Sequence, residues 1–214
     1  PAHFAAAVER SGLDVSMAEL QGHLLRHKGE PLLALENVPG FEHSDAHHRL
    51  TDWLNEAGYS HWWGQLCPTD LGIPMVRRRF FLVASRTVRV GEPTQTRIHR
   101  PVPSVLEAHP PDTGIDPDTL ERFEDAFHTV DSTDADAVAA CFTGAYARSP
   151  VYAGSYLRTP TGLRLFSPTE ILRLMGFPEH CRLPDDIPRK KAYKLVGNSV
   201  SVDCVRAALT ALSL

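Results

Sequence analysis

Residues 31–38 read Pro-Leu-Leu-Ala-Leu-Glu-Asn-Val, and this stretch decides the fold. Its apolar run ends abruptly at two polar residues, Glu36 and Asn37. A short, continuous apolar run is typical of a parallel strand that is buried on both faces of a sheet. Polar side chains at the carboxyl end of such a strand lie where open α/β sheets bind their ligands. The sequence therefore predicts a binding site at Glu36 and Asn37.

Two amphipathic helices are expected, one before this strand in the sequence and one after it. Ser16 and Glu19 form a capping box, which predicts a helix over 16–27. A second helix is expected over about 45–57, where Gly58 ends it. The residues that would face inward from this second helix are Leu50, Trp53 and Leu54.

Two further strands are expected near 60–67 and 79–85. The loop between them carries Gly72, Pro74 and three consecutive arginines. Alternation of helix and strand, followed by a hairpin, predicts the second half of a doubly wound, Rossmann-like α/β sheet.

The composition of the chain changes at about residue 86. From there to about residue 140 it is rich in Pro, Thr, Asp and His, and one helix is expected to open at Asp116. The aromatic segment at 141–146 is β-prone. We therefore interpret the stretch from about residue 86 to about residue 140 as a separate small lobe or an elaborated insertion.

Two more helices are expected in the C-terminal part. Ser167 and Glu170 form a capping box that opens one of them, and Gly176 closes it. A final helix follows Gly197-Asn198-Ser199-Val200. Its predicted apolar face consists of Val202, Val205, Leu209 and Leu212.

Composition places the chain among ordinary globular proteins. Hydrophobic residues make up 43% of its 214 residues, and the net charge of −4 excludes a protein that coats nucleic acid by charge alone. Its four cysteines are scattered and form no CxxC pair, which favours a reducing cytoplasm over a disulfide framework or a zinc site. Three histidines at 43, 47 and 48 lie beside Glu42 without established ligand spacing, so no metal site is predicted.

Four short motifs occur in a fixed order. Each is weak alone, since a strand-end carboxylate, an arginine run and a Gly-Asn-Ser turn are all common. In chain order they are Glu36-Asn37-Val38, Gly72-Ile73-Pro74-x-x-Arg77-x-Arg79, Arg173-Leu174-Met175-Gly176-Phe177-Pro178 and Gly197-Asn198-Ser199-Val200.

This succession closely resembles the later motifs of the cytosine-C5 methyltransferases, from about residue 30 to the C-terminus. The segments at 67–74 and 141–155, the second opening with Cys-Phe-Thr, carry a closer likeness to the Dnmt2-type branch. The resemblance implies three parts. Residues 1–88 would belong to the catalytic domain, 89–165 to a target-recognition lobe with a variable insertion at 89–140, and 166–214 to a segment returning to the catalytic domain.

The resemblance also implies roles for the motif residues. Glu36 would stabilise the N3/N4 edge of cytosine as a thiolate adds to C6, and Arg79 would bind O2. Arg77 would either support Arg79 or touch the backbone of the substrate. The target base would be flipped out of its helix or loop to reach them. S-adenosylmethionine would contact Asn198, Ser199 and Val200. Contacts to the nucleic acid are expected from Asn37, Cys141, Phe142, Thr143, Gly144 and Arg164.

One essential group of this family is absent from the sequence. The nucleophilic cysteine lies in a Pro-Cys pair, and the chain contains none; Cys67 precedes a proline instead. The glycine-rich cofactor loop is also missing. We therefore expect stability and activity only with an N-terminal half, supplied as another subunit, a missing segment or a second copy.

Three functions are compatible with the sequence. The first, and the one we expect, is DNA cytosine methylation, because this activity is broad in the family and split or multi-subunit arrangements are familiar among bacterial DNA methyltransferases. The second is methylation of transfer RNA, which the Cys-Phe-Thr segment favours. The third is a non-catalytic relative that binds nucleic acid or regulates, although a binding module has no need for a cofactor segment.

Overall fold

The computed structural model describes residues 31–111, 113–184 and 186–212. The helix predicted over 16–27 lies outside these residues. The chain divides into two compact units. The first comprises Pro1–Leu66, Arg78–Gln95 and Val205–Leu214, and the second comprises Cys67–Arg77 and Thr96–Cys204.

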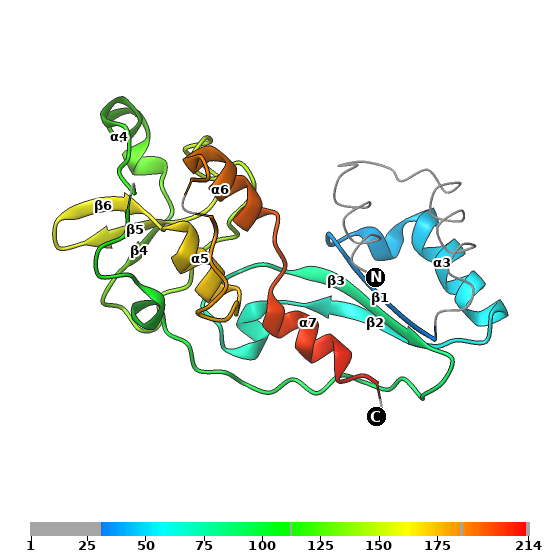
Figure 1. The fold of residues 1–214 in the computed structure, drawn as a ribbon. Coiled ribbons are helices and arrows are strands. Elements are labelled where there is room, and N and C mark those ends of the chain that lie inside the picture. Colours follow the sequence, from blue (N-terminus) through cyan, green and yellow to red (C-terminus); the bar gives the residue numbers. More distant parts are fainter. Residues whose placement is uncertain (1–30, 112, 185, 213–214) are drawn as a thin grey trace. The chain divides into compact units, whose positions relative to one another are not determined.

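The first unit is built on a three-stranded sheet in the order β1-β3-β2 (Figure 1). Its strands are β1 (Leu32–Asn37), β2 (Ser60–Leu66) and β3 (Arg79–Ser85). β2 and β3 pair antiparallel, which confirms the predicted hairpin. The connection between them contains a short 3₁₀ helix, Pro68–Leu71.

The predicted environment of β1 is wrong in two respects. β1 pairs antiparallel with β3, and among its residues only Leu35 is buried. β3 lies between β2 and β1 and runs antiparallel to both of them. Within the described part of the chain β1 has a partner along one edge only, which leaves Leu32 exposed.

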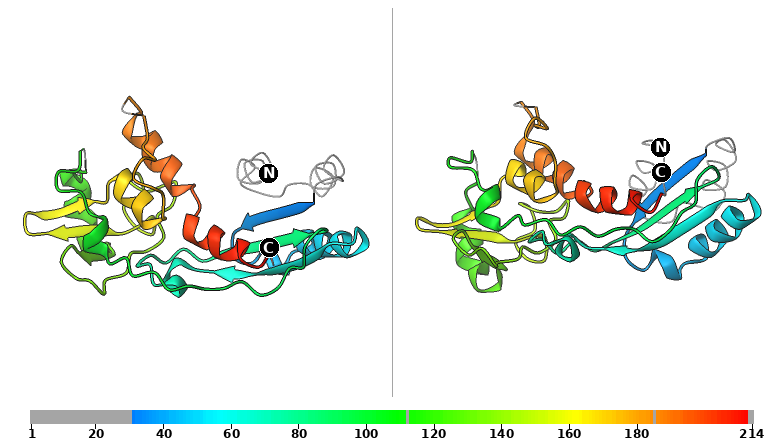
Figure 2. Two further views of the ribbon diagram at one scale, coloured as in Figure 1. Left: turned by 60° about the horizontal axis from the view of Figure 1, so that its bottom comes forward. Right: turned by 90° about the horizontal axis from the view of Figure 1, so that it is seen from below.

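Helix α3 (Asp45–Glu56) covers one face of this sheet (Figure 2). A 3₁₀ turn, Phe41–His43, precedes it, and the Ser44 side chain caps its first turn. Leu50 and Leu54 are buried as predicted, whereas Trp53 is only partly buried. They pack with Leu35, Tyr59, Phe80 and Leu82. Gly58 follows the helix at φ 75°, a conformation that favours glycine.

The second unit contains a small sheet together with α-helices and 3₁₀ helices (Figure 1). Its strands are β4 (Thr129–Asp131), β5 (Tyr156–Thr159) and β6 (Gly162–Leu165), with β4 parallel and β6 antiparallel to β5. Its α-helices are α4 (Pro117–Phe123), α5 (Pro168–Leu174) and α6 (Arg189–Gly197), and 3₁₀ helices span Val102–Val105 and Glu124–Ala126. The Asp116 cap and the Ser167–Glu170 capping box are both present, as predicted.

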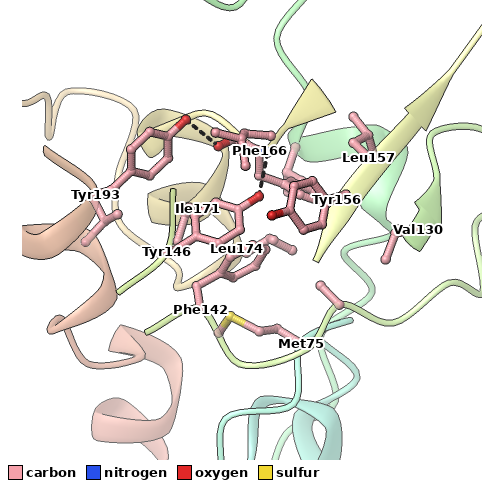
Figure 3. Close-up of a cluster of buried hydrophobic side chains, with 14 of the residues drawn as sticks. Met75, Val130, Phe142, Tyr146, Tyr156, Leu157, Phe166, Ile171, Leu174 and Tyr193 are labelled. Atoms are coloured by element: carbon pink, nitrogen blue, oxygen red, sulfur yellow. Dashed lines mark hydrogen bonds between the residues drawn. The ribbon is translucent and has the colours of Figure 1, made fainter. Parts of the chain in front are cut away.

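Buried tyrosines organise the core of the second unit (Figure 3). The Tyr146 hydroxyl accepts a hydrogen bond from the Phe166 amide (3.0 Å) and donates one to the Ser155 carbonyl (2.5 Å). The Tyr193 hydroxyl donates to the Phe166 carbonyl at 3.0 Å. Burial raises the pKa of Tyr146 well above its ordinary value, so this hydroxyl stays neutral. Each buried hydroxyl thus has a partner, as a packed core requires.

The β-prone segment at 141–146 forms no strand. The segment turns instead, with the Tyr146 amide donating to the Thr143 carbonyl at 3.0 Å. The turn points the rings of Phe142 and Tyr146 into the same core, where their centroids lie 4.9 Å apart. Side chains four residues apart meet in this way on a turn, whereas in a strand their backbone positions would be much farther apart.

Helix α7 (Val202–Leu209) forms as predicted, but it buries a different face. The buried residues are Asp203, Cys204, Ala207, Ala208 and Ala211. Val202, Val205 and Leu212 are partly exposed and Leu209 is exposed. Alanine side chains are small, so a helix can pack closely against its neighbours along an alanine-rich face. In the described part of the chain, this is the face of α7 that is buried.

Candidate active site

Glu36 and Arg79 form an ion pair at the end of the first sheet. The Arg79 Nε atom lies 3.3 Å from Glu36 Oε1, and the two side chains are 19% and 22% exposed. The pairing register explains their proximity. Glu36 faces Phe81 across the β1–β3 ladder, so Arg79, two residues earlier, lies on the same face of the sheet at the diagonal position. The site therefore presents a carboxylate and a guanidinium side by side.

Asn37 stabilises the backbone at this strand end. Its side-chain oxygen accepts a hydrogen bond from the Val38 amide at 2.8 Å. The next turn is held by Glu42, which accepts from the Gly40 amide at 3.0 Å and from the Gln65 side chain. These contacts fix the chain immediately after Glu36.

The three consecutive arginines have three different environments. Arg77 is buried, Arg78 is exposed and Arg79 is partly exposed. Alternate residues of an extended chain point to opposite sides, so Arg77 and Arg79 leave the backbone on the side opposite to Arg78. Arg79 is thereby able to form its ion pair with Glu36.

Arg77 acts as a clamp on backbone carbonyls of the second unit. Its side chain is 4% exposed and donates to the carbonyl oxygens of Phe142 (2.9 Å), Gly197 (3.1 Å) and Ser199. A planar guanidinium can hold several carbonyls in one fixed arrangement. Arg77 thereby joins the Cys-Phe-Thr segment to the Gly-Asn-Ser segment.

Two glycines let these segments touch. A Cβ atom on Gly197 would collide with the Thr143 carbonyl, and one on Gly144 would collide with the Asn198 side-chain oxygen. The sequence signal was present in both segments, because a glycine at a fixed place in a motif often marks close backbone approach.

The residues predicted to hold the cofactor connect α6 to α7. Asn198 is exposed, whereas Ser199 and Val200 are partly buried. The Ser199 hydroxyl donates to the Leu195 carbonyl at 3.0 Å. Of the three side chains, Asn198 is therefore the one that offers a polar group at the surface.

Two predicted nucleic-acid contacts have structural partners instead. No part of the Phe142 side chain is exposed, so it cannot touch a substrate here. Arg164 forms a two-pronged ion pair with buried Glu170, at 2.8 and 2.7 Å. Cys141 lies beside Arg77, with its sulfur 3.5 Å from Nη1. Thr143 accepts a hydrogen bond from the Ala145 amide at 3.2 Å.

Sequence reasoning missed a second buried ion pair, between Arg100 and Asp203 (2.7 Å). The Asp203 carboxylate also lies against Gly176, which adopts φ 82° and has no room for a Cβ atom. An aspartate on a helix face between apolar residues was the available signal, since a buried carboxylate needs a cation. Asp203, near the start of α7, thus contacts both Arg100 and Gly176 of the Leu-Met-Gly-Phe-Pro motif.

The histidine cluster near Glu42 does not form a metal site in the described residues, where no three His, Cys, Asp or Glu side chains gather suitably. His47 is buried against aromatic rings, 4.7 Å from the ring centre of Trp63. Neither of its ring nitrogens has a hydrogen-bond partner in the described part of the chain. None of the described helices is long and apolar enough to span a membrane.

None of the four cysteines, which all lie in the described part of the chain, is an obvious nucleophile. All four are free thiols. Cys67 is buried, and its sulfur accepts hydrogen bonds from the Thr69 hydroxyl (3.1 Å) and the Arg77 amide (3.4 Å). Burial raises the pKa of Cys204 to about 11. A raised pKa keeps this thiol protonated and unreactive at neutral pH.

Comparison with solved structures identifies the fold. Dnmt2 methyltransferase from Schizosaccharomyces pombe superposes with a TM-score of 0.80 and 25% identity, over 92% of this chain and 70% of that one. The Entamoeba histolytica methyltransferase EhMeth superposes with a TM-score of 0.83 and 22% identity, over 96% and 71%. These similarities confirm the predicted α/β methyltransferase fold.

The amino-acid sequence of the chain is also similar to the sequences of known methyltransferases. A tRNA (cytosine(38)-C(5))-methyltransferase from Spodoptera frugiperda is 28% identical over 84% of this chain and 65% of its own length. Type II methyltransferase M.MspI from a Moraxella species is 26% identical over 89% of this chain and 48% of its own. The chain thus spans between about half and two thirds of the length of these relatives.

Two family models match the chain. Residues 1–40 match the ATPase lid domain of mitochondrial chaperone BCS1-like proteins, a segment too short to assign the rest. Residues 23–113 and 143–213 match the C-5 cytosine-specific DNA methylase family, which is well over half of the chain. They include all four motifs around Glu36, Arg79, Gly176 and Asn198, so this chain belongs to the C-5 cytosine-specific DNA methylase family.

Proposed function

We propose that this chain is the C-terminal part of an enzyme that transfers a methyl group from S-adenosylmethionine to C5 of cytosine in a nucleic acid. The observation that carries the proposal is the Glu36–Arg79 pair at the end of β1. Membership of the methylase family supports the choice of cytosine as the reacting base.

The pair suits the edge of a cytosine ring. Cytosine presents an amino donor at N4 and acceptors at N3 and O2 along one edge. A carboxyl group can accept from N4 and share a proton with N3, while a neighbouring guanidinium donates to O2. Uracil has an acceptor at position 4, so it would oppose the carboxylate of Glu36. The two side chains therefore select cytosine as well as orient it.

The same pair stabilises the charge that develops during the reaction. Addition of a thiolate at C6 places negative charge on the O2 and N3 side of the ring. Arg79 donors are already held beside this edge by Glu36, so little reorganisation is needed when the charge appears. We assign Arg77 a positioning role, because its buried guanidinium holds backbone carbonyls rather than reaching the surface.

The described residues fit one side of a cofactor site. Asn198 offers an exposed amide and Val200 a partly exposed apolar side chain on the same short connection. S-adenosylmethionine, when bound, supplies the electrophilic methyl group. Asn198 would orient it by hydrogen bonding, and Arg77 holds the connection through the Ser199 carbonyl.

A further proposal concerns the nucleophile. No cysteine of this chain follows a proline, and Cys67 and Cys204 are buried. We therefore propose that an N-terminal methyltransferase half carrying a Pro-Cys pair completes the enzyme, as a separate chain or as a preceding segment. The greater length of the relatives supports this arrangement.

Two substrate classes have specific support. Transfer RNA is favoured by similarity to the Spodoptera tRNA methyltransferase and to Dnmt2 structures at 25% identity. DNA is favoured by similarity to M.MspI over 89% of this chain. We place transfer RNA first, reversing the sequence expectation, because both sequence and structure contribute to it. In either polymer the reacting cytosine must leave its stack to reach Glu36.

The test is methyl transfer by the complete protein. It is incubated with labelled S-adenosylmethionine and either total transfer RNA or unmethylated genomic DNA, and the nucleosides are identified by mass spectrometry. The proposal predicts 5-methylcytidine from RNA, and the second candidate predicts 5-methyldeoxycytidine from DNA. Absence of both, together with unchanged nucleic-acid binding in Glu36→Ala, would instead support a non-catalytic binding relative.

A further inference from the structure

Tyr152 is an aromatic side chain that the described chain leaves uncovered. It is 99% exposed, whereas the other tyrosines of its unit, at positions 146, 156 and 193, are buried in the core. An aromatic ring in full contact with water stabilises nothing in the folded chain itself. Its placement therefore calls for a partner outside the described residues.

The backbone holds Tyr152 in an unfavourable conformation. Its φ is 62°, in the left-handed region that residues other than glycine rarely adopt. Ala147, five residues earlier, has φ 63°. Such conformations persist only where the surrounding structure fixes them, and they cluster at sites that bind or react.

The surrounding structure does fix this loop, which we define as residues 143–153. Its two ends are joined by a hydrogen bond from the Thr143 amide to the Ala153 carbonyl (2.9 Å). The Tyr156 hydroxyl donates to the Pro150 carbonyl (2.9 Å), and the Ser149 hydroxyl donates to the Val151 carbonyl (3.2 Å).

The residues after Tyr152 anchor the loop to the core. Ala153 and Ser155 are buried. Gly154 is pressed against the rings of Phe142 and Tyr146, which leave no room for a Cβ atom. The backbone at Tyr152 is therefore already held in place, so binding does not have to order it and costs less entropy.

The charge around the loop indicates an anionic partner. Arg148, in the loop itself, is exposed and donates only to the nearby Gly144 carbonyl (3.2 Å) among the contacts of its guanidinium in the described chain. An exposed arginine in the same short loop as an exposed aromatic ring matches a phosphate chain with unpaired bases.

We propose that Tyr152 is a stacking platform for an unpaired base of the nucleic acid, with Arg148 contacting the adjacent phosphate. The inference rests on the proposed function only in taking nucleic acid as the partner. A hydrophobic protein partner fits less well, since Tyr152 is a single exposed ring on a loop whose neighbours Pro150 and Val151 are partly buried. Stacking on any base needs only its flat face, so the site tolerates different sequences.

The test measures binding of the complete protein to a fluorescently labelled single-stranded oligonucleotide and to a fully paired duplex. Tyr152→Ala should weaken single-strand binding about 5- to 150-fold, which corresponds to the loss of one stacked base. Tyr152→Phe should bind within about 2-fold of the parent, since the ring is kept. Val138→Ala, which shortens a side chain of the same unit that is 40% exposed, is the matched control and should bind like the parent.

A second variant separates the effect from misfolding. Tyr152→Gly removes the ring but suits a positive φ, so it should weaken binding without lowering the thermal midpoint. A 2-aminopurine in the oligonucleotide should be quenched by the parent and by Tyr152→Phe only.

Two outcomes would overturn the inference. One is unchanged single-strand binding in Tyr152→Ala, and the other is an equal loss of duplex and single-strand binding. Unchanged oligonucleotide binding with lost attachment of a protein partner would assign the ring to that partner instead. Methyl transfer by the parent protein is measured separately, so its failure is not confused with a failure of stacking.

Discussion

Replacing Arg77 by methionine tests whether this buried arginine holds the second unit together. Methionine keeps much of the length and the apolar stem but removes every donor. The carbonyls of Phe142, Gly197 and Ser199 would each lose a charged partner. Arg78 is the matched control, because it is the next residue in the chain and its side chain is exposed.

The expected loss can be worked out from these contacts. A hydrogen bond from a charged group contributes about 1.5–3 kcal/mol, so three contribute roughly 4–9 kcal/mol. Returning a 4% exposed guanidinium to water recovers several kcal/mol of desolvation, which offsets part of that sum. We therefore expect Arg77→Met to lower the free energy of unfolding by about 2–4 kcal/mol, and Arg78→Met by less than about 0.5 kcal/mol.

The assay is urea unfolding of the complete protein, followed by circular dichroism and by tyrosine fluorescence. Equal slopes in parent and variant would show that the midpoint shift reports stability alone. A loss below about 1 kcal/mol in Arg77→Met would refute the clamp, and so would an equal loss in Arg78→Met.

Three further perturbations address other buried groups. Glu170→Gln should cost roughly 2–4 kcal/mol in urea unfolding, because it leaves the Arg164 guanidinium without its buried carboxylate. Gly176→Ala should lower the thermal midpoint by several degrees, since φ is 82° and the Asp203 carboxylate fills the space; an unchanged midpoint would contradict this packing. Burial lowers the pKa of His47 below its ordinary 6.5, so the folded protein keeps this ring neutral while the unfolded chain binds a proton as the pH falls. The free energy of unfolding should hold above pH 6.5 and decline below it, and His47→Phe should remove that part of the pH dependence.

Local patterns were sufficient for much of the fold. The hairpin strands, the Ser167–Glu170 capping box and the helix over 45–56 follow from periodicity and caps that involve neighbouring residues. The strand-end position of Glu36 follows from an apolar run with a sharp polar end. These features depend on residues close together in the chain, which is why a single sequence contains them.

Features that depend on distant residues were harder to predict. The direction of β1 is set by β3, which lies more than forty residues later. The turn at 141–146 forms because Phe142 and Tyr146 share a core with Phe166, although both are β-prone residues. The buried face of α7 is its alanine face, since the choice depends on what packs against it.

In the candidate site, too, features that depend on neighbouring residues could be predicted, and contacts between distant residues could not. The order of the motifs located Glu36 and Arg79, and alternation along an extended chain could have separated Arg78 from its two neighbours. Nothing local indicated that Arg77 would bind carbonyls more than sixty residues away. The Glu170 partner of Arg164 could be suspected only once Glu170 was known to be buried and Arg164 partly buried.

The most direct test of the role of Glu36 is the single-turnover rate of methyl transfer by the complete protein with Glu36 changed to glutamine. Glutamine keeps the shape of the side chain but cannot carry a negative charge or share a proton with N3. We predict a rate at least about 100-fold below the parent, the usual contribution of a positioned acid or base. Binding of the nucleic acid should change little. A rate within about 3-fold of the parent would contradict the assignment of Glu36 as the residue that activates the cytosine ring.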